Sequence, residues 1–298
     1  MKVLVTGATG YVGQVVVKQL KQKNYEVVGL CRNEKSAQKL KDLGAVPLLG
    51  DIKEPEKIAN AAKDVDGIIH LAFIHDFGNY DDSISVDLKL ISAITEAIQG
   101  TNKPFITTSA TSISHFQGEV GVIDDFDIVL KNESRGKCEV SVLSAKDKGV
   151  RSSVVRLPPF VYGLNGSSFI PSLIKTARER GESNYVEGLT NELDAVHVED
   201  AARIYILALE KGKAGSIYNA ATQGVQFRKL AEAVAQNVGV PAKPIKSGQA
   251  KEVWGEFLAH VFQLNTRTTS NRSRSELGWV PTNPVGVIED VVRGSYKN

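Results

Sequence analysis

Short apolar runs alternate with amphipathic segments through the first half of the chain. The runs predict strands at 2–5, 26–30, 45–49, 67–73, 104–109 and 151–157. Between them, apolar residues recur at helical spacing over 12–20, 35–43, 55–62, 84–99 and 133–148. This alternation predicts an α/β protein with a Rossmann-type, doubly wound parallel sheet and right-handed crossovers.

The second half of the chain is less regular. Helical spacing returns over 169–180, 198–211 and 227–238, and 216–220 predicts a strand that rejoins the sheet. We therefore expect a Rossmann domain at 1–163, completed by 196–222. A smaller, mostly C-terminal substrate-binding lobe would comprise 164–195 and 223–298.

The first apolar run leads directly into three glycines with the spacing G-x-x-G-x-x-G, which open the first predicted helix. Glycines in this context permit a tight turn, a close approach of the backbone to a pyrophosphate, and close packing of helix on strand. The helix also presents free N–H groups and the positive end of its dipole to the phosphates. The predicted phosphate-binding segment comprises Gly7, Thr9, Gly10, Tyr11, Val12 and Gly13.

The segment that follows the second predicted strand distinguishes two cofactors. An acidic residue there would bind the ribose hydroxyls of NAD, but the chain has Arg32. A guanidinium clamps a 2′-phosphate through two charge-assisted hydrogen bonds, and Lys35 adds a second charge, so we expect NADP rather than NAD. The alternative is a solvated Arg32 with Glu34 facing the ribose. Asp51, after the third strand, is expected either to bind the adenine amino group or to cap the next helix.

The composition is that of an ordinary globular chain. Its net charge of +2 gives no reason to expect a nucleic acid or a membrane surface as a partner. Cys31 and Cys138 fit no metal-binding spacing, so we expect no metal site and a reducing, cytoplasmic location. The first strand begins at residue 2 and no apolar run reaches membrane-spanning length, so neither a signal peptide nor a membrane segment is expected.

A series of motifs, in order along the chain, resembles the short-chain dehydrogenase/reductase superfamily in its extended, epimerase-like form. The matching motifs are 6–13 (TGATGYVG), 50–51 (GD), 70–72 (HLA), 107–111 (TTSAT), 156–163 (RLPPFVYG), 196–202 (VHVEDAA) and 277–281 (LGWVP). The resemblance implies an NAD(P)-binding protein. Further cofactor contacts are then expected from Ile52, Leu71, Ala72, Phe73, Thr108, Pro158, Pro159 and Phe160.

The catalytic pattern departs from that family. Its chemistry depends on a serine together with Tyr-x-x-x-Lys, and none of the eight tyrosines here has a lysine four residues on. Ser109 matches the serine. The departure resembles an atypical subgroup with basic residues in place of the pair, in which Lys131 and Arg135 take the two positions, one helical turn apart. Glu139, a further turn along, is in position to hold Arg135.

Three further residues are candidates for the substrate pocket: His75, His115 and Tyr162. The acidic group at 124–127 more closely fits a solvated loop than a metal site. The leading hypothesis is an NADP-dependent oxidoreductase that reduces a small carbonyl, quinone or conjugated substrate. The alternatives are a non-catalytic NADP(H)-binding redox sensor and a sugar-nucleotide epimerase or dehydratase. A homodimer is compatible with the apolar stripe at 84–98, which packing on the sheet also requires.

Overall fold

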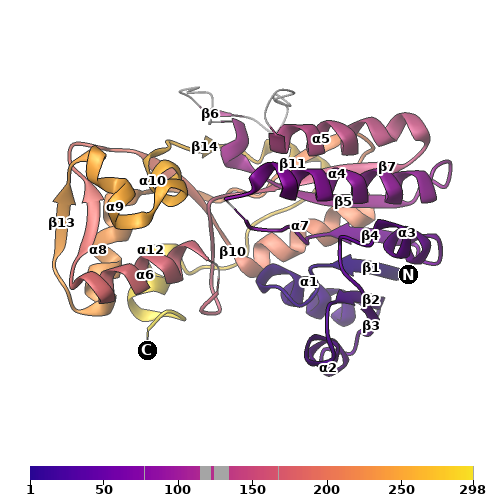
Figure 1. The fold of residues 1–298 in the computed structure, drawn as a ribbon, viewed down its shortest axis with the longest axis horizontal. Helices are drawn as coiled ribbons and strands as arrows, with labels where there is room; N and C mark the ends of the chain where they lie inside the picture. Colours follow the sequence, from indigo (N-terminus) through magenta and orange to yellow (C-terminus); the bar gives the residue numbers. More distant parts are fainter. Residues whose placement is uncertain (77, 115–121, 124–133, 167, 298) are drawn as a thin grey trace.

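The computed structural model describes residues 1–76, 78–114, 122–123, 134–166 and 168–297, and its centre is a seven-stranded parallel sheet (Figure 1). The strands are β1 (Lys2–Thr6), β2 (Glu26–Cys31), β3 (Val46–Leu49), β4 (Gly67–His70), β5 (Pro104–Ala110), β7 (Arg151–Leu157) and β11 (Ser216–Asn219). They lie in the order β11-β7-β5-β4-β1-β2-β3. This order and the parallel pairing confirm the predicted Rossmann fold.

Helices cover both faces of the sheet because alternate strand residues point to opposite sides. Val3 and Val5 of β1 pack into one hydrophobic cluster, and Leu4 packs into another. The first cluster receives α1 (Tyr11–Gln22), α2 (Glu34–Asp42) and α7 (Val198–Lys211). The second receives α3 (Pro55–Lys63), α4 (Tyr80–Ala97) and α5 (Ser134–Ser144).

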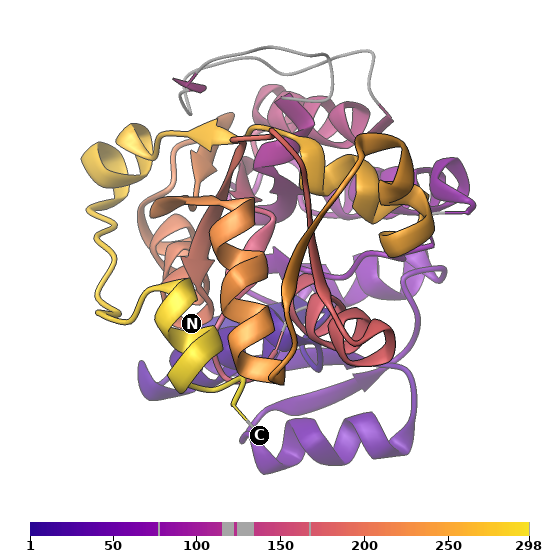
Figure 2. The same ribbon diagram turned by 90° about the vertical axis from the view of Figure 1, so that its left-hand side faces the viewer.

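The remaining elements form most of a smaller lobe with its own core. Its strands are β8 (Phe160–Tyr162), β9 (Ser183–Val186), β10 (Glu192–His197), β12 (Gln223–Gln226) and β13 (Ala242–Ile245). Its helices are α6 (Phe169–Arg180), α8 (Phe227–Val238), α9 (Ala250–Trp254), α10 (Glu256–Gln263) and α12 (Val287–Arg293). Figure 2 shows α12 beside α8. Stacked and edge-to-face rings of Phe227, Trp254 and Phe262 fill the core.

Two short elements connect the lobes. β14 (Arg267–Thr268) pairs with β6 (Val122–Ile123), and α11 (Asn271–Leu277) packs against α7. Leu277 and Trp279, expected in the smaller lobe, are fully buried in the core of the Rossmann domain. Among the described residues, no helix is both long enough and apolar enough to cross a membrane.

Candidate active site

The glycine segment lies where the strand order reverses, between β1 and β4, which is where ligands bind in open α/β sheets. Gly7 has a positive φ of 66°, and a Cβ there would lie 2.7 Å from the backbone nitrogen of Ala72. A Cβ on Gly13 would lie 2.0 Å from the Gly7 carbonyl oxygen. Both positions therefore require glycine, as the motif predicted.

The start of α1 fits a phosphate group. Gly10 is the exposed N-cap, no side chain caps the helix, and its first turn carries no acidic residue. The first-turn N–H groups of α1 thus receive no hydrogen bond from a capping side chain and are available to a pyrophosphate. The Gln14 amide donates to the Thr9 carbonyl oxygen at 3.0 Å and holds the loop, while Val12 packs against the domain core.

A buried chain of hydrogen bonds connects β1 with helix α4. The Oγ1 atom of Thr6 lies 2.6 Å from Nδ1 of His70, and Nε2 of His70 lies 2.8 Å from Oδ1 of Asp87. Since an ionised carboxylate only accepts, Nε2 carries the shared proton. The Thr6 hydroxyl oxygen accepts from the Ala72 N–H at 3.2 Å. The chain therefore fixes the segment after β4, along which the cofactor is expected to lie.

Arg135 is held at the end of this chain. Its Nη1 atom lies 3.5 Å from Oδ2 of Asp87, and Nη2 donates to the Thr108 carbonyl oxygen at 2.7 Å. The guanidinium also sits 3.8 Å from the centre of the Phe73 ring, a cation–π contact. Its side chain is 13% exposed, so a large part of its charge is shielded from water. α4, α5 and the ends of β4 and β5 thus converge on one cation.

Ser109 follows directly after the carbonyl that binds Arg135. Its side chain is buried, and among the described residues its Oγ atom has no hydrogen-bond partner. Thr108 is fixed by its own hydroxyl, which lies 3.0 Å from the His70 carbonyl oxygen and 2.9 Å from the Tyr205 hydroxyl. Arg135 is therefore held against the backbone of β5 at the residue that precedes Ser109.

Asp87 was not among the predicted site residues, although the sequence carries a signal for it. Buried positions Ile84, Asp87, Ile91 and Ile94 form one stripe of α4, and an acidic residue in such a stripe needs a partner. Burial acts to raise the pKa of Asp87. The hydrogen bond and charge of His70 and the charge of Arg135 outweigh burial, and the pKa is lowered.

The prediction that Glu139 holds Arg135 is wrong. Glu139 instead accepts from Nε and Nη2 of Arg156 on β7, at 2.8 and 2.7 Å, and both side chains are 1% exposed. In a bidentate pair of this kind each buried charge compensates the other, so Glu139 anchors helix α5 to strand β7.

The residues expected near the adenosine ribose lie at the surface. Arg32 and Lys35 are both exposed, and no ion pair among the described residues includes either of them. Asp51 does not cap α3, whose N-cap is Glu54; its carboxylate accepts from the Lys53 N–H at 3.0 Å. Ile52 is buried in the domain core.

The segment after β4 brings aromatic rings to the site. Leu71, Ala72 and Phe73 are half-buried, and His75 is exposed with its ring edge-on to Phe73 at 5.3 Å. Although part of the residue is exposed, the protein around the imidazole ring removes some of its water, and this loss, followed by the charge of Arg135, lowers the pKa of His75. A neutral imidazole next to a guanidinium suits a substrate contact, which stays a prediction.

Other predicted contacts are corrected. Phe160 is fully buried and stacks on Phe262 in the smaller lobe's core, so its ring has no open face for a cofactor. Tyr162 is 3% exposed and donates to the Val285 carbonyl oxygen at 2.7 Å, contrary to a substrate contact. Tyr11 is not among these corrections: it is half-buried and donates to the Gly163 carbonyl oxygen at 2.6 Å, and its cofactor contact stays a prediction.

The remaining predictions are not tested by the structure. Pro158 and Pro159 are buried at the end of β7, where a cofactor contact stays a prediction. Lys131, His115 and the acidic group at 124–127 lie outside the described residues.

The fold and the glycine-rich turn at the switch point of the sheet are those of NAD(P)-binding Rossmann proteins. Two family models match the chain: the NmrA-like family over residues 1–121, and the NAD dependent epimerase/dehydratase family over 138–221. The chain belongs to the short-chain dehydrogenase/reductase superfamily, in its epimerase-like branch.

Relatives cover nearly the whole chain. The uncharacterized protein C2A9.02 of Schizosaccharomyces pombe is 36% identical over 99% of this chain and 100% of its own length. The uncharacterized protein YLL056C of Saccharomyces cerevisiae is 37% identical over 99% of each. A 4-hydroxy-2-methyl-3-oxo-4-farnesyl-3,4-dihydroquinoline-1-oxide ketoreductase of Stigmatella aurantiaca is 26% identical over 94% of this chain and 92% of its own.

The fold is shared with solved structures. The dTDP-glucose 4,6-dehydratase of Bacillus anthracis, in complex with NAD, superposes with a TM-score of 0.77 at 17% identity, covering 100% of this chain and 97% of that one. At this identity the likeness establishes the fold alone.

Proposed function

We propose that the protein is an NADP(H)-dependent oxidoreductase that reduces a small carbonyl, quinone or conjugated substrate. The observation that carries the proposal is the position of the Arg135 guanidinium, which binds the Thr108 carbonyl oxygen directly before Ser109 at the carboxyl end of β5. Ser109 offers a hydroxyl with no partner among the described residues, and Arg135 offers a fixed cation. The similarity to a ketoreductase of Stigmatella aurantiaca supports a carbonyl as the reacting group.

The preference for NADP is supported by Arg32 and Lys35. Both lie at the end of β2 and the start of α2, beside the position of the adenosine ribose in this fold. Since both side chains are exposed and outside any ion pair of the described region, they are available to a 2′-phosphate.

The two central residues stabilise negative charge on a reacting oxygen. NADPH, when bound, supplies a hydride. Ser109 then donates a hydrogen bond to the substrate oxygen, and the positive charge of Arg135 stabilises the enolate-like or quinol anion that forms. A guanidinium stays charged at ordinary pH, so Arg135 does not supply the proton, which comes from water.

The first test is NADPH oxidation, followed by absorbance, against a panel of quinones, aldehydes, ketones and enones. Ser109→Ala and Arg135→Met should each lower kcat/KM by about 100-fold, the usual effect of removing one such donor. Lys137→Ala, an exposed lysine on the same helix, is the matched control and should leave turnover unchanged.

The outcomes separate the alternatives. Full activity in a variant with both Lys131 and Arg135 changed to Ala would refute the electrostatic mechanism. Tight NADPH binding without turnover across the panel would count against an enzyme and favour the redox-sensor alternative.

The cofactor preference has its own test. Arg32→Ala should weaken NADPH binding by about tenfold or more and leave NADH binding unchanged, because only NADPH carries the 2′-phosphate. Lys39→Ala, exposed on the same helix α2, is the control. Equal losses for both cofactors would contradict the assignment.

A further inference from the structure

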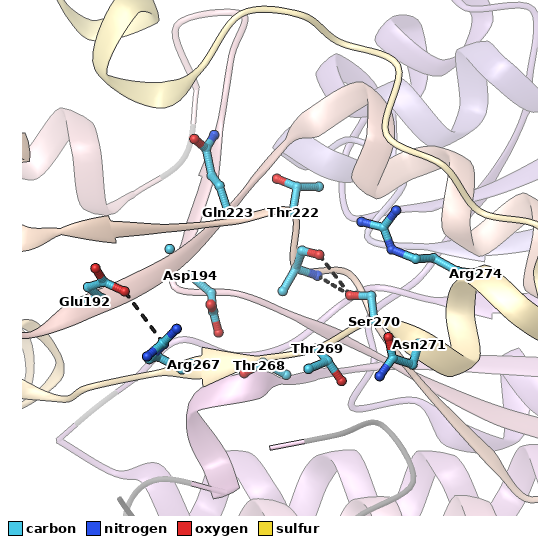
Figure 3. Close-up of a pocket in the computed structure, with 12 residues that line it drawn as sticks. Glu192, Asp194, Thr222, Gln223, Arg267, Thr268, Thr269, Ser270, Asn271 and Arg274 are labelled. Atoms are coloured by element: carbon cyan, nitrogen blue, oxygen red, sulfur yellow. Dashed lines mark hydrogen bonds and ion pairs between the residues drawn. The ribbon is translucent and has the colours of Figure 1, made fainter. Parts of the chain in front are cut away.

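A second cavity, separate from the Arg135 site, opens against the smaller lobe. It has a volume of about 350 Å³ and lies between β10, the chain entering β12, and the segment from β14 into α11 (Figure 3). Its lining is almost entirely polar and shares no residue with the site around Ser109. At roughly 30 Å³ for each water-sized group, the cavity has room for a molecule of about twelve non-hydrogen atoms.

The alternation of strand β10 creates this cavity. Leu193 and Ala195 point into the core of the smaller lobe. Glu192 and Asp194 therefore face the opposite side, where they line the cavity. An acidic pair on this face requires partners from β14 and α11, which lie across the cavity (Figure 3).

Asp194 is only partly satisfied by the protein. Its side chain is buried, with the residue 3% exposed, and its Oδ2 atom has no hydrogen-bond partner among the described residues. Thr269 also lines the cavity, and its buried Oγ1 atom likewise has no hydrogen-bond partner among the described residues. Leaving such atoms unpaired is costly, so the two atoms favour a polar group over an apolar one at this side of the cavity.

The opposite side of the cavity supplies an unused cation. Arg274 extends from α11 toward Thr222 (Figure 3), and no ion pair or side-chain hydrogen bond of the described region includes it. Arg267 differs, because its guanidinium lies 3.7 Å from the Glu192 carboxylate at the cavity rim. Arg274 is thus the cation available to an anionic group.

We propose that this cavity binds a small hydroxylated carboxylate, such as a sugar acid or a hydroxy acid. The ligand carboxylate pairs with Arg274, and its hydroxyl groups bind Oδ2 of Asp194 and Oγ1 of Thr269. A ligand hydroxyl can donate a hydrogen bond to the Asp194 carboxyl group and accept one from the Thr269 hydroxyl.

A hydroxyl suits Asp194 better than an ammonium group does. Burial raises the pKa of Asp194 to about 7, although hydrogen bonding by Thr268 and the charge of Arg267 act to lower it. A carboxyl group that is partly neutral at pH 7 hydrogen-bonds a hydroxyl in either form, whereas an ammonium requires the ionised form.

Calorimetric titration with D-gluconate tests the proposal on the full-length protein. D-glucitol, which lacks the carboxylate, and butyrate, which lacks hydroxyls, are matched probes. Gluconate should bind at least tenfold more tightly than either. Arg274→Gln and Asp194→Leu should each weaken gluconate binding by about tenfold or more. Arg293→Gln, an exposed arginine on α12 outside the cavity, should not.

NADPH binding, measured on every variant, shows whether the variant is folded and tests the Rossmann site separately. Equal affinity for gluconate and glucitol would overturn the role of the carboxylate. Gluconate binding that Arg274→Gln leaves unchanged would overturn the site, as would a lack of binding by gluconate, malate and lactate in a protein that binds NADPH.

Discussion

The ion pair between Asp87 and Arg135 offers the sharpest test of how the site is held. At the observed separation of 3.5 Å, opposite unit charges attract by about 5 kcal/mol at an effective dielectric constant of about 20. Desolvation and side-chain ordering offset part of this attraction. We therefore expect a net coupling free energy of about 2 kcal/mol between the two side chains.

A double-mutant cycle measures this coupling. Urea unfolding of the wild type, Asp87→Asn, Arg135→Met and the double variant gives four free energies of unfolding. Methionine keeps an unbranched chain against Phe73 but makes no ion pair. Asp81→Asn, exposed in the first turn of the same helix, is the control and should change stability by less than about 1 kcal/mol. A coupling below about 0.5 kcal/mol would refute the argument that Asp87 positions Arg135.

The pH dependence provides a second readout. The pKa of Asp87 is lowered, so its stabilising effect is fully present above the unfolded value near 4. The effect is lost as the pH falls through the lower, folded-state pKa. The stability difference between wild type and Asp87→Asn should therefore stay constant from about pH 7 to 5 and shrink below about pH 4.

Three further predictions follow from packing and charge, each measured by urea unfolding. Gly13→Ala should cost about 3 kcal/mol and weaken NADPH binding, because its Cβ would lie 2.0 Å from the Gly7 carbonyl oxygen. Glu139→Gln should cost about 3–5 kcal/mol by removing the carboxylate that compensates buried Arg156. Burial raises the pKa of the Asp194 carboxyl to about 7, so the unfolded state loses this proton at lower pH than the folded state does. The wild-type free energy of unfolding should therefore decline between about pH 4 and 7, by as much as about 4 kcal/mol. Asp194→Asn should abolish this decline. A wild-type profile that is flat over this range would contradict the last prediction.

The main sheet was predictable because its central strands, such as β1 and β4, are buried apolar runs, although the edge strand β3 is largely exposed. Arg151–Leu157 forms β7 with the expected bounds, and the glycine spacing predicted a turn whose positive φ at Gly7 the structure shows. The expected fourth strand, 67–73, ends at His70 because the following residues leave the sheet toward the site. The strands β8, β10 and β12 were not predicted, because each is too short to show a clear alternation of apolar and polar residues.

The candidate site was only partly predictable, since its contacts join distant segments. Ser109 could be placed because it lies at a strand end. Glu139 was assigned to Arg135 on helical spacing alone, yet the neighbouring strand β7 presents Arg156 to it. Asp87 partners a residue 48 positions away, a pairing that helical periodicity does not reveal.

The burial of Trp279 in the Rossmann core bears on how the chain folds during synthesis. Its indole N–H donates to the Asp200 carbonyl oxygen at 2.9 Å, and the ring is fully enclosed by a domain that begins at residue 2. Domains generally fold as units as they leave the ribosome, N-terminal ones first. Here the core of the domain that contains β1 stays incomplete until Trp279 has been synthesised, so a premature stop before residue 277 would leave the Rossmann core unfilled.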